Sequence, residues 1–249
     1  FRSPRSVAEA FIRGLHDADG YRAVGGQSEL VTTISRDLAQ GVAMMHKAFN
    51  ALPEHVMSSI AILSKRLNNY FNKVPTYSAE DFLRMRDIVS KKIEKNVDDE
   101  FVLQHIPRCL ELVKEVEARR AEIDALPRQL IHEDLHPHNV LFAGDSLRAI
   151  IDFDSVRVGE QARDVAFALY RFGRQFFAQK KREFTHAEAR RLGQLFLNAY
   201  TTERPLVPQE IALLPVLLQD DFLRKILFVL RGVYEEGNLT WAKDLPKFF

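Results

Sequence analysis

The sequence contains little of what several classes of protein require. Its single cysteine, Cys109, excludes an internal disulfide framework and any metal site built from paired cysteines. No apolar run reaches the roughly 18 residues that a membrane-spanning helix needs, and the first residues lack the continuous apolar core of a signal peptide. We therefore expect a cytoplasmic protein that has no membrane partner.

An excess of charge of one sign is also missing. The 35 lysines and arginines nearly balance the 34 aspartates and glutamates, which gives a formal net charge of +1. A chain without a broad basic field has no general attraction for a nucleic-acid backbone, so nucleic acid is not an expected partner. The 249 residues are 46% hydrophobic, enough to bury the core of one large or two small domains.

The glycine-rich phosphate-binding loops are absent too. Neither G-x-G-x-x-G nor G-x-x-x-x-G-K-[ST] occurs in the chain. The glycines in AVGGQSE, residues 23–29, are interpreted as a turn before a helix. The sequence therefore gives no indication of a nucleotide site of either kind.

What the sequence does contain is helical periodicity. Between residues 28 and 52 apolar residues recur every three or four positions, which is the spacing of one helix face. His46 stands beside this stripe and is interpreted as a packing or surface histidine rather than a catalytic one. Ser78 and Asp81 have capping-box spacing at the start of another predicted helix. Residues 28–126 show almost no strand pattern.

The pattern changes after Pro127. Three short runs rich in β-branched or aromatic residues, RQLIHEDL, HNVLFAG and LRAIIDFD, are separated by turn-forming residues, which predicts short strands around a loop. Helical spacing returns in ARDVAFALYRFGRQFF and continues through the later segments. The predicted fold class is mainly α with a small β insertion.

The predicted loop carries a spaced set of polar residues. His132, Asp134 and Asn139 follow the order His-x-Asp-x-x-x-x-Asn, and Asp152 comes with the next strand. A turn between two short strands can bring these positions to one edge. A phosphoryl-transfer enzyme needs a carboxylate that takes the proton of the acceptor hydroxyl, and oxygen ligands for magnesium on the nucleotide phosphates. The set therefore indicates phosphoryl transfer.

At these residues the sequence resembles the aminoglycoside phosphotransferase and choline kinase superfamily, whose catalytic segment commonly reads HGDLHPGNVLF followed by IDFD or IDWE. This chain reads HEDLHPHNVLF and then IDFD, and the resemblance is close over residues 130–169. The resemblance implies a protein-kinase-like fold with ATP and Mg2+ as cofactors. It also implies a small-molecule hydroxyl acceptor, for which aminoglycosides, choline and homoserine all remain open.

Carried over residue by residue, the resemblance implies a role for each polar position. Asp134 is expected to be the catalytic base, and Asn139 and Asp152 are expected to hold magnesium on the nucleotide. His132 is expected to brace the catalytic loop, and Asp164, in ARDVAFAL, to hold that loop from a neighbouring helix. The first three roles are chemical and the last two are structural.

Glu133 departs from the pattern of the family, which often has glycine at this position. A side chain there implies that the backbone need not adopt a glycine-only conformation. This departure therefore concerns the geometry of the catalytic loop.

A metal-dependent hydrolase is an alternative function. Four residues alternate at strand spacing and could face one metal ion, namely His132, Asp134, His136 and His138. Against this, Pro137 interrupts a regular strand, and the cluster leaves the asparagine and the second aspartate of the loop set unused. We expect instead that His136 packs into the loop and that His138 is a partly exposed turn residue.

A kinase-like protein without catalysis is a second alternative. Kinases of this type have a nucleotide-binding lobe of about five strands with a lysine that contacts the phosphates. Three candidate lysines, Lys47, Lys65 and Lys73, stand in helical or loop contexts instead. The chain is therefore interpreted as the C-terminal helical lobe, with the N-terminal β lobe absent, and a binding protein that lacks the nucleotide lobe stays open.

The predicted organisation has three segments. Residues 1–27 are assigned to the hinge side, residues 28–126 to a helical substrate-side region, and residues 127–249 to the catalytic loop and the C-terminal helices, with residues 28–249 forming one lobe. The chain alone is expected to be inactive, because positioning and charge stabilisation supply most of phosphoryl-transfer catalysis. The uncovered surface of the lobe is expected to favour self-association.

The acceptor is expected to bind against the helices of residues 52–126 and the C-terminal helices. An acidic cleft there would favour a cationic acceptor. The acids that could contribute to it are Asp220, Asp221, Glu235 and Glu236.

Overall fold

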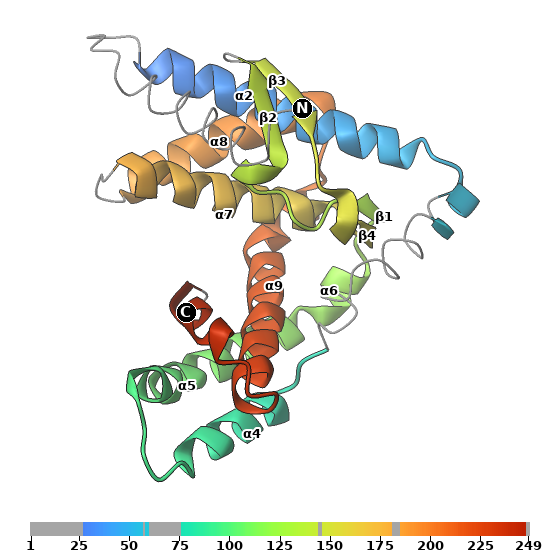
Figure 1. Ribbon diagram of the computed structural model, residues 1–249. Coiled ribbons are helices and arrows are strands. Elements are labelled where there is room, and N and C mark those ends of the chain that lie inside the picture. The colour runs from blue at the N-terminus through green and yellow to red at the C-terminus, as the bar shows by residue number, and fades with distance from the viewer. Residues whose placement is uncertain (1–26, 57, 60–75, 144–145, 181–184, 248–249) are drawn as a thin grey trace. The chain divides into compact units, whose positions relative to one another are not determined.

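The computed structural model describes residues 27–56, 58–59, 76–143, 146–180 and 185–247 (Figure 1). These residues are mainly helical, and their strands form two small two-stranded sheets. The predicted fold class, mainly α with a small β insertion, is confirmed. The predicted hinge-side segment, residues 1–27, lies almost entirely outside the described residues.

The described elements follow one another along the chain. The α-helices are α2 (Gln27–Asn50), α4 (Ala79–Ser90), α5 (Val97–Ala118), α6 (Arg120–Asp124), α7 (Gln161–Lys180), α8 (His186–Glu203) and α9 (Pro208–Tyr234). The strands are β1 (Arg128–Ile131), β2 (Val140–Ala143), β3 (Ser146–Ile150) and β4 (Arg157–Glu160). Short 3-10 helices are η2 (Pro137–Asn139), η3 (Phe153–Ser155) and η4 (Leu239–Lys247). Over the described ranges, no helix has the length and apolar character needed to cross a bilayer.

The chain divides into two compact units that alternate along the sequence. Unit 1 comprises Phe1–Leu67 and Pro127–Ala212, and unit 2 comprises Asn68–Leu126 and Leu213–Phe249. All five residues to which the sequence assigns a role belong to unit 1. The grouping of residues 28–249 into one lobe stays a prediction.

Unit 1 is built around the long helix α2. The helix packs along α8, which lies beside it in Figure 1, and buries small and medium apolar residues such as Ala39 and Val42. The β2–β3 hairpin lies against the same helix. A Cβ at Gly41 would come within 2.0 Å of Leu147 Cδ2, so a larger residue there would push the β3 side chain off the helix. The helix predicted from the periodicity of residues 28–52 is confirmed.

Unit 2 contains α4, α5, α6 and most of α9. Helix α4 starts with the predicted capping box, in which Ser78 Oγ accepts from the N–H of Asp81 at 3.3 Å and Asp81 Oδ2 accepts from the N–H of Ser78 at 2.9 Å. The two bonds satisfy backbone donors that the first turn of a helix leaves unpaired. Because the whole motif lies within four consecutive residues, it was readable from the sequence.

Candidate active site

The strand pairing of unit 1 is nested, and this nesting creates the site. Strand β1 pairs antiparallel with β4, and β2 pairs antiparallel with β3. The loop between β1 and β2 and the segment between β3 and β4 therefore lie next to each other. Two hydrogen bonds join them, from the N–H of Ile151 to the carbonyl of Asn139 and from the ring of His132 to the carbonyl of Ile151, each 2.9 Å. The predicted polar residues are thus carried by two adjacent segments.

His132 joins the two segments with both of its ring nitrogens. Nδ1 accepts from the N–H of Asp134 at 3.3 Å, and Nε2 therefore carries the proton that is donated to the carbonyl of Ile151. The side chain is fully buried, and its ring packs on that of Phe153 with the centroids 4.8 Å apart. This geometry suits the predicted role of His132 as the brace of the loop.

Asn139 is also held by the loop. Its Nδ2 donates to the carbonyl of Asp134 at 2.9 Å, and its backbone N–H donates to the carbonyl of His136 at 2.9 Å. The side chain is 4% exposed. Because the amide nitrogen is used inside the loop, Oδ1 is the atom that can bind a cation.

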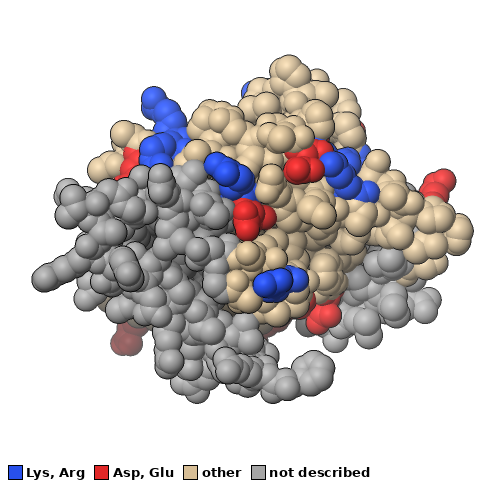
Figure 2. Space-filling view, turned by 90° about the horizontal axis from the view of Figure 1, so that it is seen from above, with Lys and Arg blue, Asp and Glu red and all other residues tan. Residues whose placement is uncertain are grey.

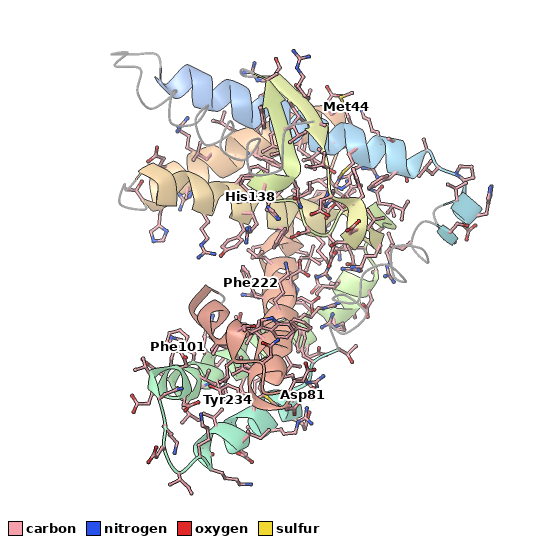
Figure 3. The ribbon with its side chains drawn as sticks, in the orientation of Figure 1. Met44, Asp81, Phe101, His138, Phe222 and Tyr234 are labelled. Atoms are coloured by element: carbon pink, nitrogen blue, oxygen red, sulfur yellow. The ribbon has the colours of Figure 1, made fainter. Side chains whose placement is uncertain are left out.

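Asp134 is half-buried, and solvent reaches its carboxylate. Its Oδ2 lies 3.3 Å from Nε2 of His136, whose Nδ1 accepts from the N–H of His138 at 3.2 Å. His136 thus packs into the loop, while His138 is exposed on η2, beside α7 (Figure 3). Both histidines lie as the sequence predicts.

Asp152 lies two residues beyond the end of β3 and is the N-cap of η3 in the left-handed conformation, with φ 66° and ψ 63°. Aspartate is one of the few residues other than glycine that tolerates this region. The side chain is exposed and makes no capping hydrogen bond to η3. A carboxylate is therefore presented at the edge of the segment that lies beside the catalytic loop.

The backbone at Glu133 differs from the expectation. The prediction that this position need not adopt the conformation favoured by glycine is wrong, since its φ is 69°. The N–H of Glu133 donates to Oδ1 of Asp164 at 2.8 Å, and its carboxylate pairs with Arg157 at 2.8 Å. These two interactions offset the steric cost that a side chain adds in the left-handed region.

Asp164, in the first turn of α7, accepts hydrogen bonds from the backbone of the loop. Its Oδ2 accepts from the N–H of His132 at 2.6 Å, and its Oδ1 accepts from the N–H of Glu133. Complete burial would by itself raise the pKa of Asp164, but the bonds from His46 and from the backbone of His132 outweigh burial and lower the pKa below its ordinary value. The aspartate is therefore ionised and accepts at both oxygens.

His46 and Tyr200 complete the surroundings of Asp164, and the sequence analysis assigned neither to the site. His46 is fully buried on α2, with Nε2 3.0 Å from Asp164 Oδ2 and Nδ1 2.6 Å from the hydroxyl of Tyr200 on α8. These partners stand 118 and 154 positions away along the chain. No local pattern could have identified them, because only folding brings the three helices together.

The ligand set of the zinc-hydrolase alternative is not assembled. Both ring nitrogens of His132 are engaged in the loop. Throughout the part of the chain that the structure describes, no group of three or more histidine, cysteine, aspartate or glutamate side chains is arranged to hold a metal ion. The Asn139 amide and the Asp152 carboxylate instead offer oxygen atoms, which suit a hard cation such as Mg2+.

Two of the acids proposed for a cationic acceptor, Asp220 and Glu235, are partnered inside unit 2. The carboxylate of Asp220 is fully buried and accepts from Tyr77 at 2.7 Å, from Arg120 at 3.0 Å and from Arg224 at 2.8 Å. Glu235 lies 3.2 Å from Arg84. The suggestion that Asp220 contributes to an acidic cleft is therefore wrong, because its charge is already neutralised within the core. Basic and acidic side chains are interspersed over the described surface seen in Figure 2.

Comparison with known proteins places this site in a family. The model of a family described as the phosphotransferase enzyme family matches residues 10–206. The homoserine kinase of Rhodopseudomonas palustris is 41% identical over 121 residues, which cover 48% of this chain and 35% of that protein. The homoserine kinase of Brucella anthropi is 34% identical over 143 residues, which cover 53% of this chain and 40% of that protein. The chain thus spans little more than a third of the length of these relatives.

Solved structures agree on the fold. A glucosamine kinase superposes with a TM-score of 0.53 at 18% identity, covering 98% of this chain and 59% of that chain. The ethanolamine kinase of Plasmodium vivax superposes with a TM-score of 0.50 at 16% identity, covering 87% and 59%. At such low identity the likeness concerns the fold alone.

Proposed function

Because the chain belongs to the phosphotransferase enzyme family, we propose that it supplies the catalytic loop and the metal ligands of an ATP-dependent kinase that phosphorylates a hydroxyl group of a small molecule. The observation that carries the proposal is the nested strand pairing. It brings the loop with Asp134 and Asn139 next to the segment with Asp152. Two hydrogen bonds then lock the two segments together.

Asp134 is proposed to take the proton of the acceptor hydroxyl. The acceptor oxygen forms a bond to the γ-phosphorus while the bond between that phosphorus and the bridging oxygen of ADP breaks, and the proton passes to the carboxylate. The half-buried Asp134 side chain can be reached by a substrate. Its backbone is held by His132 and Asn139, which keeps the carboxylate in place before the acceptor binds.

Asn139 and Asp152 are proposed to hold the magnesium ion of the nucleotide. A bound magnesium ion neutralises negative charge on the β- and γ-phosphates. The neutral amide oxygen of Asn139 is held in place by the loop, while the carboxylate of Asp152 supplies charge at the edge of the site. An Asp152→Ala variant is therefore expected to lose both magnesium-dependent nucleotide binding and turnover.

Homoserine is the acceptor that we propose first. The support is the identity of 34% to 41% to the two homoserine kinases, which exceeds the 16% to 18% to the glucosamine and ethanolamine kinases. Homoserine also carries a hydroxyl group whose proton Asp134 could take.

The nucleotide-binding lobe is proposed to lie outside the described residues. The four strands of the described residues flank either the catalytic loop or the neighbouring segment with Asp152, so none of them is assigned to such a lobe. The short coverage of the homoserine kinases agrees with this view. For the same reason the helical part alone is expected to be inactive. We further propose the cytoplasm as its location, where ATP is supplied.

The test is an assay of ADP production by the complete protein, with homoserine, ethanolamine, glucosamine and an aminoglycoside as acceptors. Turnover with one acceptor, lost in Asp134→Asn and kept in Asp154→Asn, is the expected result. Asp154 is the matched control because it is an exposed carboxylate of the neighbouring segment to which no role is assigned. Nucleotide binding without transfer to any hydroxyl compound would instead favour the non-catalytic binding protein.

A further inference from the structure

A series of buried hydrogen bonds runs from Tyr200 on α8 to the catalytic loop. Tyr200 is 2.6 Å from His46, and His46 is 3.0 Å from Asp164. These hydrogen bonds therefore connect α8, the first turn of α7 and the C-terminal part of α2.

Each hydrogen bond of this series is donated in the direction of Asp164. Burial, opposed by the nearby charge of Arg204, raises the pKa of Tyr200 well above its ordinary value, so the hydroxyl keeps its proton and can donate to Nδ1 of His46. Nε2 of His46 then donates to the carboxylate of Asp164.

Asp164 connects these side-chain hydrogen bonds to the backbone of the loop. Its Oδ2 is shared by the ring of His46 and the N–H of His132, while its Oδ1 takes the N–H of Glu133. Three donors thus fix the plane of one carboxylate. Without the histidine donor the carboxylate could rotate about its own bonds, and both loop amides would follow it or lose their partner. Hydrogen bonds in a low-dielectric interior make such a rearrangement costly.

The pattern tyrosine, histidine, aspartate is not a nucleophilic triad. Tyr200, His46 and Asp164 all have side chains that solvent does not reach. No substrate could contact the hydroxyl of Tyr200 without opening the packing between α2 and α8. Any influence of the pair on chemistry must therefore act through Asp164 and the loop.

We propose that His46 and Tyr200 are positioning residues, which orient the carboxylate of Asp164 and thereby hold the backbone that carries Asp134. The effect on the structure of the loop stands on the observed hydrogen bonds alone. The effect on catalysis rests on the proposed function. Because misplacement of a reacting group slows a reaction steeply, a loosened loop is expected to lower kcat while binding of nucleotide is kept.

The structural part is tested by amide hydrogen exchange at His132 and Glu133 in the complete protein. Tyr200→Phe removes one hydroxyl and is expected to speed exchange of these two amides by about tenfold or more, since local opening requires less energy. Tyr77→Phe is the matched control, because it also removes a buried, hydrogen-bonded hydroxyl, which in this case donates to Asp220. Equal exchange at the two loop amides in Tyr200→Phe and wild type, or an equal increase in Tyr77→Phe, would overturn the proposal.

The catalytic part is tested with two replacements of His46 in the same assay. His46→Gln keeps an N–H donor that can reach Asp164, whereas His46→Leu removes it. We expect kcat to fall by about tenfold or more in the leucine variant, to recover in part in the glutamine variant, and KM for MgATP to change by less than about twofold. Equal kcat in the two variants, or a loss confined to KM, would contradict a positioning role. If no acceptor is turned over by the wild type, the proposed function fails, while the exchange experiment still decides the role of the network.

Discussion

Two fully buried aspartates, one in each unit, are stabilised by different kinds of partner. Asp164 of unit 1 accepts from two backbone N–H groups and one histidine ring. Asp220 of unit 2 accepts from a tyrosine and two arginines. Backbone partners tie a carboxylate to the conformation of a loop, whereas long side chains tie helices together without determining any backbone angle. The same residue type therefore shapes a candidate active site in one unit and a helix junction in the other.

The largest effect is expected when each of these carboxylates becomes an amide. Asp164→Asn should lower the free energy of unfolding by about 3 kcal/mol or more, because an amide N–H would face buried N–H donors. Asp220→Asn should cost less, about 1 to 3 kcal/mol, since Arg120 and Arg224 are 29% and 30% exposed and water can reach them. Urea unfolding of the two variants measures the difference. Unchanged stability of Asp164→Asn with loss of activity would point to a direct catalytic role instead.

Within unit 1, the accessible carboxylate of Asp134 contrasts with the buried carboxylate of Asp164. Asp134→Asn is expected to slow phosphoryl transfer by at least about a hundredfold, which corresponds to about 2.7 kcal/mol, with nucleotide binding nearly unchanged. The melting temperature should stay close to that of the wild type, because the carboxylate is only half-buried. Steady-state kinetics and calorimetric titration separate the two effects. Wild-type turnover in this variant would exclude Asp134 as the base.

The buried tyrosines Tyr200 of unit 1 and Tyr77 of unit 2 extend the comparison between the two networks. Tyr200→Phe should lower the free energy of unfolding by about 1 to 3 kcal/mol, since it leaves a ring nitrogen of His46 without its donor in a buried place. Tyr77→Phe should cost about 1 kcal/mol, because Arg120 and Arg224 still pair with Asp220. Thermal unfolding of both variants under one condition tests this order. A larger loss for Tyr77→Phe would show that the two networks are not distinguished as proposed.

The smallest expected effect is on how the free energy of unfolding depends on pH in acid. The folded state lowers the pKa of Asp164 below its ordinary value, which is about 3.9 in an unfolded chain. The stability that comes from this ionised group is therefore present above about pH 4 and is lost as the pH falls through the folded-state pKa. Unfolding measured from pH 6 to pH 3 should show a steeper decline for wild type than for Asp164→Asn. Equal slopes would mean that Asp164 contributes nothing to acid sensitivity.

Local patterns in the sequence determined much of the fold. The apolar spacing of residues 28–52 predicted α2, and the pair Ser78 and Asp81 predicted the start of α4, because the partners in a helix turn are three or four residues apart. The short β-branched runs after Pro127 predicted the β insertion. The spacing of the catalytic loop singled out its polar residues, although their chemical roles stay predictions until the variants are measured.

Only the tertiary structure decided the surroundings of those residues. The left-handed backbone at Glu133 depends on Asp164 and Arg157, which lie on other elements, so a propensity argument at residue 133 alone went wrong. The pairing of His46 with Asp164, and of Asp220 with Arg120, joins residues 118 and 100 positions apart. Helix periodicity records which face of an element is buried, but it does not record which polar group of a distant element meets a buried donor. That choice is made when the elements pack, because each buried polar group must then find a partner among those that packing brings within hydrogen-bonding distance.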